Sequence, residues 1–145
     1  MDFLKKIFSS MQSKQKQSSD EIDEVELRGN GEFALEAVGE SHYQNNFETI
    51  CGARKERGED LEVEARLILE DENRYDKNAV RVEVNDLHVG YLSRQVAVLY
   101  REQIRSGGHP KAIGICKANI RGGWLRKDGD KGHYGIWLDI PVIQS

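Results

Sequence analysis

The sequence has few cysteines, and neither its cysteines nor its histidines are spaced as metal ligands usually are. Among its 145 residues are two cysteines, Cys51 and Cys116, which form no CxxC pair. Its four histidines include no HxxxH spacing. A disulfide framework and a zinc site are therefore not expected. The protein is expected to work in a reducing, cytoplasmic setting.

Long apolar runs and the common catalytic motifs are also missing. No stretch approaches the roughly 20 apolar residues of a membrane span, and no signal peptide with a continuous apolar core is visible. The motifs GxSxG, GxxxxGKS/T and HExxH are absent, which excludes the recognisable hydrolase and nucleotide-binding patterns. Asp71, Glu72 and Asp76 would suit a divalent ion, but acidic residues are common and solvated at strand ends. We predict a soluble protein that is not an enzyme and has no cofactor and no metal.

Neither sign of charge is in large excess. Lysine and arginine number 21 and the acids 25, for a net charge of −4, which argues against coating nucleic acid by bulk attraction. The charges are unevenly distributed, because residues 32–72 hold 12 acids and 4 bases whereas residues 74–131 hold 12 bases and 6 acids. One half of the chain is therefore suited to meet a polyanion and the other is not.

The chain is long enough for one domain with a hydrophobic core and too short for two of ordinary size. Residues 1–11 form an amphipathic start, residues 12–19 are polar, and residues 20–26 are acidic. We interpret the start as a frayed terminus rather than a docking arm. This predicts a flexible N-terminal arm and linker over residues 1–30, followed by a folded domain over residues 31–145.

Six runs have the pattern of β-strands. Residues 61–70 and 79–84 alternate apolar and polar side chains, the period of a strand with one buried face. Four further strands are predicted at residues 32–37, 87–92, 113–118 and 134–142. Short strands in mostly hairpin-linked runs favour a mainly β fold, a small closed or nearly closed barrel, because closure removes exposed edges.

Two short helices are expected beside the barrel. In the first, Phe47, Ile50 and Cys51 fall at i, i+3 and i+4. The second begins after Ser93, a good N-cap. Its inner side is expected to carry Val96, Leu99, Tyr100 and Ile104, and its outer side Arg94, Arg101 and Arg105. We interpret the arginines as a solvated face, except Arg94, which starts the helix beside the loop considered next.

The loop at residues 73–80 joins two predicted strands and holds more varied chemistry than a turn requires. Sites for single-stranded nucleic acid need rings that stack on bases, amides for base edges, and cations for phosphates. The chain supplies all three, with the rings of His42, Tyr43, Tyr75 and Tyr91, the amides of Asn73 and Asn78, and the cations Arg74, Lys77 and Arg94. The alternative interpretation is that the loop's Asn and Asp residues form Asx-turns and the tyrosines belong to the core.

Three motifs in this order resemble the HIRAN domain: VGESHY at residues 38–43, NRYDKNAV at 73–80 and VGYLSR at 89–94. The resemblance covers about residues 33–143. It implies a six-stranded OB-like barrel with helices packed at its side. The HIRAN module is found attached to SWI/SNF-type helicase-like ATPases involved in replication-fork repair, and also as small free-standing proteins.

The resemblance also implies a mechanism. HIRAN domains that bind DNA recognise the 3′ end of a single strand, enclose the terminal nucleotide between aromatic side chains, and use the acid of a Tyr-Asp pair to accept a hydrogen bond from the 3′-hydroxyl. By resemblance, Tyr75 and Asp76 are that pair, Tyr43 is the second of two consecutive aromatics, and Arg94 contacts phosphate. An aspartate in this role favours a free hydroxyl and repels a phosphate.

The chain departs from the DNA-binding members at two places. Ser41 and His42 stand where those members have Arg-Tyr, and Arg74 stands where they have Pro; His42 can still stack on a base. We predict a non-enzymatic module that binds single-stranded DNA by its 3′ end in DNA repair or processing, with a helicase-like ATPase or another repair enzyme as the candidate partner. The alternative is a protein-interaction adaptor that retains the fold without the DNA pocket, with the acidic half and the arm as its working surfaces.

Overall fold

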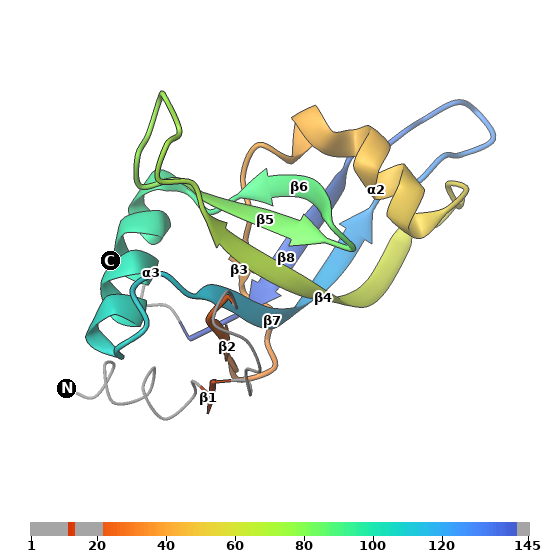
Figure 1. Cartoon of the computed structure of the whole chain (residues 1–145). Helices are drawn as coiled ribbons and strands as arrows, with labels where there is room; N and C mark the ends of the chain where they lie inside the picture. Colours follow the sequence, from red (N-terminus) through yellow and green to blue (C-terminus); the bar gives the residue numbers. More distant parts are fainter. Residues whose placement is uncertain (1–11, 14–21, 142–145) are drawn as a thin grey trace.

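The computed structural model describes residues 12–13 and 22–141, and strands dominate this part of the chain (Figure 1). The strands are β1 (Gln12–Ser13), β2 (Glu24–Glu26), β3 (Leu35–Glu36), β4 (Glu59–Leu69), β5 (Val80–Val84), β6 (Leu87–Tyr91), β7 (Ile113–Gly122) and β8 (Tyr134–Asp139). They form one sheet in the order β1-β2-β7-β4-β5-β6, with β8 paired to β7 and to β3. The mainly β prediction is confirmed, and the six expected strands are β3 to β8.

The sheet curls until its ends meet. The Val38 N–H donates to the Tyr91 carbonyl at 2.8 Å, and the Tyr91 N–H donates to the Val38 carbonyl at 2.9 Å. This bridge links the segment after β3 to β6, so the path β3-β8-β7-β4-β5-β6 returns to its start. The arrangement is OB-like, as the resemblance implied.

The alternating pattern of β4 and β5 determines which side chains fill the barrel. Leu67 of β4 and Val82 of β5 are partners in the antiparallel register, and both are 0% exposed. Val80 and Val84 point inward with them. Burying a side chain of this size contributes about 1.5–3 kcal/mol to the stability of the fold. The alternation of apolar residues therefore fixes the faces of β4 and β5, and the loop that joins the two strands is positioned with them.

The sheet begins earlier than the predicted domain boundary at Gly31. β2 pairs in parallel with the first residues of β7. Val25 is 0% exposed and Leu27 3% exposed, so both belong to the core. The acidic composition of residues 20–26 suggested a linker, but Val25 and the following Leu27 are buried, and β2 occupies the part of the β7 edge that β8 leaves free. The predicted amphipathic start at residues 1–11 lies outside the described residues.

In the part of the chain that the structure describes, two helices and a short 3-10 turn accompany the sheet: η1 (Glu40–Tyr43), α2 (Gln44–Cys51) and α3 (Arg94–Ser106). Ser93 caps α3, since its side chain accepts a hydrogen bond from the Val96 N–H at 3.2 Å. Gly52 ends α2, as expected. In the described ranges, no helix is long and apolar enough to cross a membrane.

The inner face of α3 differs in part from the prediction. Val96, Tyr100 and Ile104 are buried as expected, but Ala97 and Gln103 are buried with them, whereas Leu99 is only half-buried. The Tyr100 side chain packs directly over β7. A Cβ on Gly114 would lie 2.2 Å from the Tyr100 hydroxyl, so only glycine fits there.

Candidate nucleic-acid interface

The loop between β4 and β5 is shaped by its own polar side chains. Asn73 Oδ1 accepts hydrogen bonds from the backbone N–H groups of Tyr75 at 2.8 Å and Asp76 at 2.9 Å. Asp76 Oδ1 accepts one from the Asn78 N–H at 2.9 Å. These are Asx-turn contacts, so this part of the alternative interpretation is confirmed. The second carboxylate oxygen, Asp76 Oδ2, lies 4.0 Å from Arg94 Nε.

Several side chains of this loop and of the start of α3 are exposed to solvent, where a ligand could reach them. Tyr75 is 81% exposed, and its ring centroid lies 5.9 Å from the Arg74 guanidinium carbon. The Arg94 side chain is 78% exposed, and Lys77 is exposed as well. An exposed ring beside cations can stack on a base while the cations contact phosphates.

Arg101 holds the loop against α3. Its Nε and Nη2 donate to the carbonyl oxygens of Asn78 at 2.9 Å and Ala79 at 3.0 Å, and its Nη1 donates to Asp71 Oδ1 at 2.7 Å. The interpretation of Arg101 as a solvated residue is therefore wrong, because its side chain is committed to the loop. Arg94 keeps its exposed position and its role as a candidate phosphate contact.

A row of aromatic rings runs from η1 to β6. Tyr43 stacks on His88, with ring centroids 4.0 Å apart and an interplanar angle of 26°, and His88 meets the ring of Tyr91 edge-on at 4.7 Å. His42 is exposed at one end of the row, with its ring centroid 6.4 Å from that of Tyr43. At the other end, the Tyr91 hydroxyl donates to Glu70 Oε1 at 2.9 Å.

Glu70 joins the row to the loop, because its Oε1 also accepts a hydrogen bond from Asn73 Nδ2 at 2.9 Å. Contacts therefore run from Tyr43 to Asn73, and Asn73 in turn binds the Asp76 N–H. The predicted site residues that this connected network brings together are Tyr43, Asn73, Tyr75, Asp76, Asn78, Tyr91 and Arg94. His42 and Lys77 lie exposed beside it.

Hydrogen bonds and burial set the charge of the network. Burial alone would raise the pKa of Glu70, but hydrogen bonds from Asn73, Arg81 and Tyr91 together outweigh it and lower that pKa. Burial lowers the pKa of His88, so this ring is neutral at pH 7. Burial, and then the bond to Glu70, raise the pKa of Tyr91. At neutral pH the His88 and Tyr91 rings are thus uncharged and lie beside the ionised Glu70 carboxylate.

The sequence analysis missed three polar members of this network, Glu70, Arg81 and His88. His88 was missed because the pairing between β5 and β6 is irregular. Arg81 pairs with Tyr91 and Glu83 pairs with His88, so the register shifts by one residue between these two pairs. In a regular strand, residues three apart face opposite sides, but an extra residue in the ladder brings them to one side. Gly90, inside the strand pattern, is the local signal for such a bulge.

A carboxyl group with an unusual pKa lies behind the aromatic row. Glu40 Oε2 accepts a hydrogen bond from the Ile136 N–H of β8 at 2.7 Å. Burial raises the pKa of Glu40 to about 7; the Ile136 N–H opposes this rise and the nearby Glu36 carboxylate adds to it. Near neutral pH this carboxyl is therefore close to half protonated.

The raised pKa of Glu40 is expected to make stability depend on pH. The ordinary value is 4.5, so the folded state binds the proton more tightly than the unfolded state, and stability falls as pH rises from about 4.5 to about 7. We expect a loss of about 1–2 kcal/mol, less than the full shift implies because Glu40 is only partly buried. Glu40→Gln should remove this loss, which urea unfolding of both proteins at pH 5 and pH 7.5 measures. The same pH dependence in both proteins would contradict the assignment.

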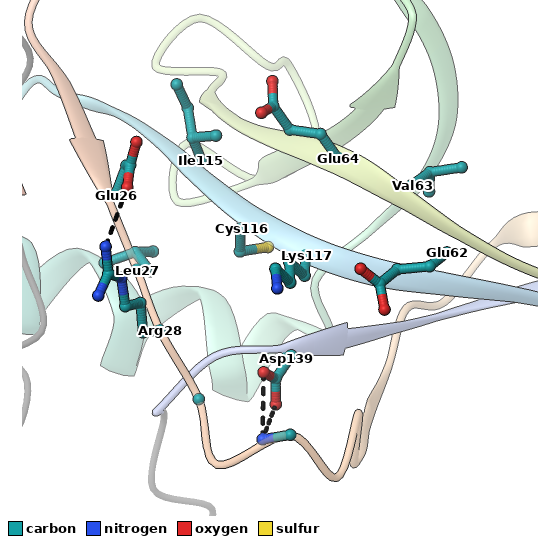
Figure 2. Close-up of a pocket in the computed structure, with 12 residues that line it drawn as sticks. Glu26, Leu27, Arg28, Glu62, Val63, Glu64, Ile115, Cys116, Lys117 and Asp139 are labelled. Atoms are coloured by element: carbon teal, nitrogen blue, oxygen red, sulfur yellow. Dashed lines mark hydrogen bonds and ion pairs between the residues drawn. The ribbon is translucent and has the colours of Figure 1, made fainter.

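A groove of about 770 Å³ lies elsewhere on the molecule. Figure 2 shows that β2, β4, β7 and the end of β8 contribute to it, with Glu26, Glu62, Glu64, Lys117 and Asp139 among its lining residues. Asp139 is engaged there, since it accepts a hydrogen bond from the Gly31 N–H at 3.0 Å. None of the predicted site residues lines this groove, so it is separate from the aromatic row and the loop.

The fold and this surface together define a small OB-like binding module, with rings, a carboxylate and exposed cations along one connected set of elements. The family model of the HIRAN domain matches residues 30–119, more than half of the chain, and the protein belongs to the HIRAN domain family. This family is known for DNA binding, and its domain is a binding module rather than a catalytic one. Comparisons with curated proteins and with solved structures found no match.

Proposed function

We propose that this protein is a non-enzymatic module that recognises single-stranded DNA by its 3′ end, in DNA repair or processing in the cytoplasm. The observation that carries the proposal is the contact network that joins the stacked Tyr43 and His88 rings to the loop of Asp76. Stacking rings beside a carboxylate suit a nucleoside with a free hydroxyl better than they suit a continuous phosphate backbone.

In the proposed mechanism each part of the surface has one task. Tyr75, which is 81% exposed, stacks on a base near the strand end. Asp76 accepts a hydrogen bond from the 3′-hydroxyl through Oδ2, the oxygen that its own turn does not use. Arg74, Lys77 and Arg94 contact phosphates, and the rings of the aromatic row form one side of the binding surface.

The direct test compares oligonucleotides that differ only at the 3′ end. We expect a strand with a 3′-phosphate to bind about tenfold or more weakly than one with a 3′-hydroxyl, since it loses a charge-assisted hydrogen bond and adds charge beside Asp76. With Arg74, Lys77 and Arg94 as the phosphate contacts, log K should fall with log salt with a slope of about −2. Fluorescence anisotropy at two salt concentrations measures both quantities. Equal affinity for the two strands would exclude 3′-end recognition.

The adaptor function remains the second candidate, and the groove of Figure 2 is the observation that favours it. Four of its lining residues are acidic and two are basic, so a partner there would carry basic side chains. A protein that binds no strand in the test above, yet retains its fold by circular dichroism, would support the adaptor. A helicase-like ATPase or another repair enzyme is the proposed partner under either function.

A further inference from the structure

Two side chains attach η1 and the start of α2 to the edge of β8. Glu40 Oε2 accepts the Ile136 N–H at 2.7 Å. Gln44 Oε1 accepts the Tyr134 N–H at 2.8 Å, and Gln44 Nε2 donates to the Tyr134 carbonyl at 3.1 Å and to the Glu40 carbonyl at 2.9 Å. β3 pairs with the end of this edge of β8, at Leu138 and Trp137, and the two side chains bond the beginning of the edge, at Tyr134 and the Ile136 N–H.

The neighbouring strands are shaped to admit the Glu40 side chain. A Cβ on Gly90 of β6 would lie 3.4 Å from Glu40 Cγ, and a Cβ on Gly135 of β8 would lie 3.1 Å from Glu40 Oε2. A Cβ at Gly135 would also lie 2.9 Å and 3.0 Å from two ring atoms of Trp137, so both the Trp137 ring and the Glu40 carboxyl would have to shift to admit a side chain there.

His42 and Tyr43 lie between Glu40 and Gln44 in the sequence, so the two bonded residues hold both ends of the segment that carries these rings. We propose that Glu40 and Gln44 are positioning residues, which hold the His42 and Tyr43 rings in place for the DNA end, and that the charge on Glu40 couples this binding to pH. The proposal rests on the proposed function and deepens it.

The sign of the coupling follows from the surroundings of Glu40. Its neutral form keeps an acceptor oxygen for the Ile136 N–H and gains a donor toward Glu36, with which it shares a side-chain hydrogen bond. Other titratable groups near η1 include His42, Tyr43, His88 and Tyr91. On β8, Tyr134 lies under the Arg54 guanidinium and Trp137 under that of Arg121. A strand held by the His42 and Tyr43 rings would bring negative charge toward η1, and nearby negative charge favours the neutral form of a carboxyl. Binding should therefore take up a proton, and affinity should rise as pH falls.

The experiment measures affinity for a 3′-hydroxyl oligonucleotide at pH 6, 7 and 8. If binding raises the pKa of Glu40 by about one unit, wild-type affinity should be about fivefold higher at pH 6 than at pH 8. Glu40→Gln imitates the neutral form and should bind at pH 8 as tightly as the wild type does at pH 6. Gln44→Ala loses part of the attachment and should bind about tenfold more weakly than the wild type at every pH. Glu40→Ala loses both the attachment and the titrating carboxyl, so it should bind weakly with no pH dependence. Glu62→Gln, which removes an exposed carboxyl of β4, should keep the wild-type profile.

Two results would overturn the proposal. The first is an unchanged pH profile in Glu40→Gln, which would place the pH dependence on a group other than Glu40. The second is wild-type affinity in Gln44→Ala. If neither the wild type nor any variant binds the strand, the proposed function fails. NMR signals of the Tyr43 ring then test separately whether Glu40 and Gln44 position that ring. The ring signals should then titrate near pH 7 in the wild type and shift in Gln44→Ala, and signals that do neither would refute it.

Discussion

Gly123→Ala is expected to lower the free energy of unfolding by about 3–5 kcal/mol, through overpacking and backbone strain together. Gly123 has a φ of +74°, and a Cβ there would lie 2.0–2.4 Å from three ring atoms of Tyr134. That ring cannot move aside, because it is 1% exposed. It stacks on Phe47 with centroids 5.5 Å apart, and the guanidinium of Arg54 lies 4.7 Å from its centroid. Urea unfolding followed by circular dichroism measures the change.

Gly129→Ala is the matched control in the same connection between β7 and β8. Gly129 has a φ of +92°, but nothing lies within 4 Å of its Cβ position. It should therefore show the backbone strain alone, about 1–2 kcal/mol. Similar losses in the two variants would mean that the Tyr134 ring moves aside, and that its packing against Phe47 and Arg54 does not hold it in place.

Asp76→Asn is expected to weaken binding of a 3′-hydroxyl strand by about 1–3 kcal/mol, the range for a lost charge-assisted hydrogen bond. The asparagine keeps an oxygen for the Asn78 N–H, which Asp76 Oδ1 binds at 2.9 Å, so the turn survives and only the charge is removed. Asp76→Ala should lose at least as much, because the turn bond goes too. Arg94→Ala should weaken all strands alike and reduce the salt dependence, since it removes a phosphate contact.

Asp76→Asn distinguishes recognition of the 3′ end from general electrostatic attraction to nucleic acid. A carboxylate near phosphates is repulsive, so in a generic binder Asp76→Asn would tighten binding. Asp86→Asn is the control, because Asp86 lies exposed in the β5–β6 turn and the change removes the same charge; its affinity should stay within about twofold of wild type, as expected for a distant surface charge. Neutral or tighter binding by Asp76→Asn, with the fold intact, would defeat the mechanism and favour the adaptor.

The local pattern of the chain was enough to predict most of the strands and the helix caps. Leu67 and Val82 follow a period of two, and each is 0% exposed in the fold; Ser93 caps α3 as its position before an apolar helical pattern predicted. These signals depend on residues close in sequence, which is why a single sequence reveals them. The polar composition of the β4–β5 loop and its motif were likewise visible in the sequence, and the HIRAN assignment followed from them.

Tertiary structure alone decided how these elements meet. The parallel pairing of β2 with β7 joins residues about 90 positions apart in the sequence. No local sequence pattern predicts which distant strands pair in this way. The bulge that turns His88 and Tyr91 to one side, and the bonds that commit Arg101 to the loop, depend on which strands and helices become neighbours. The pKa of Glu40 depends on burial between β6 and β8. The residues for a binding surface are thus readable in the sequence, whereas their convergence and charge arise from contacts between distant segments, which only the folded chain brings together.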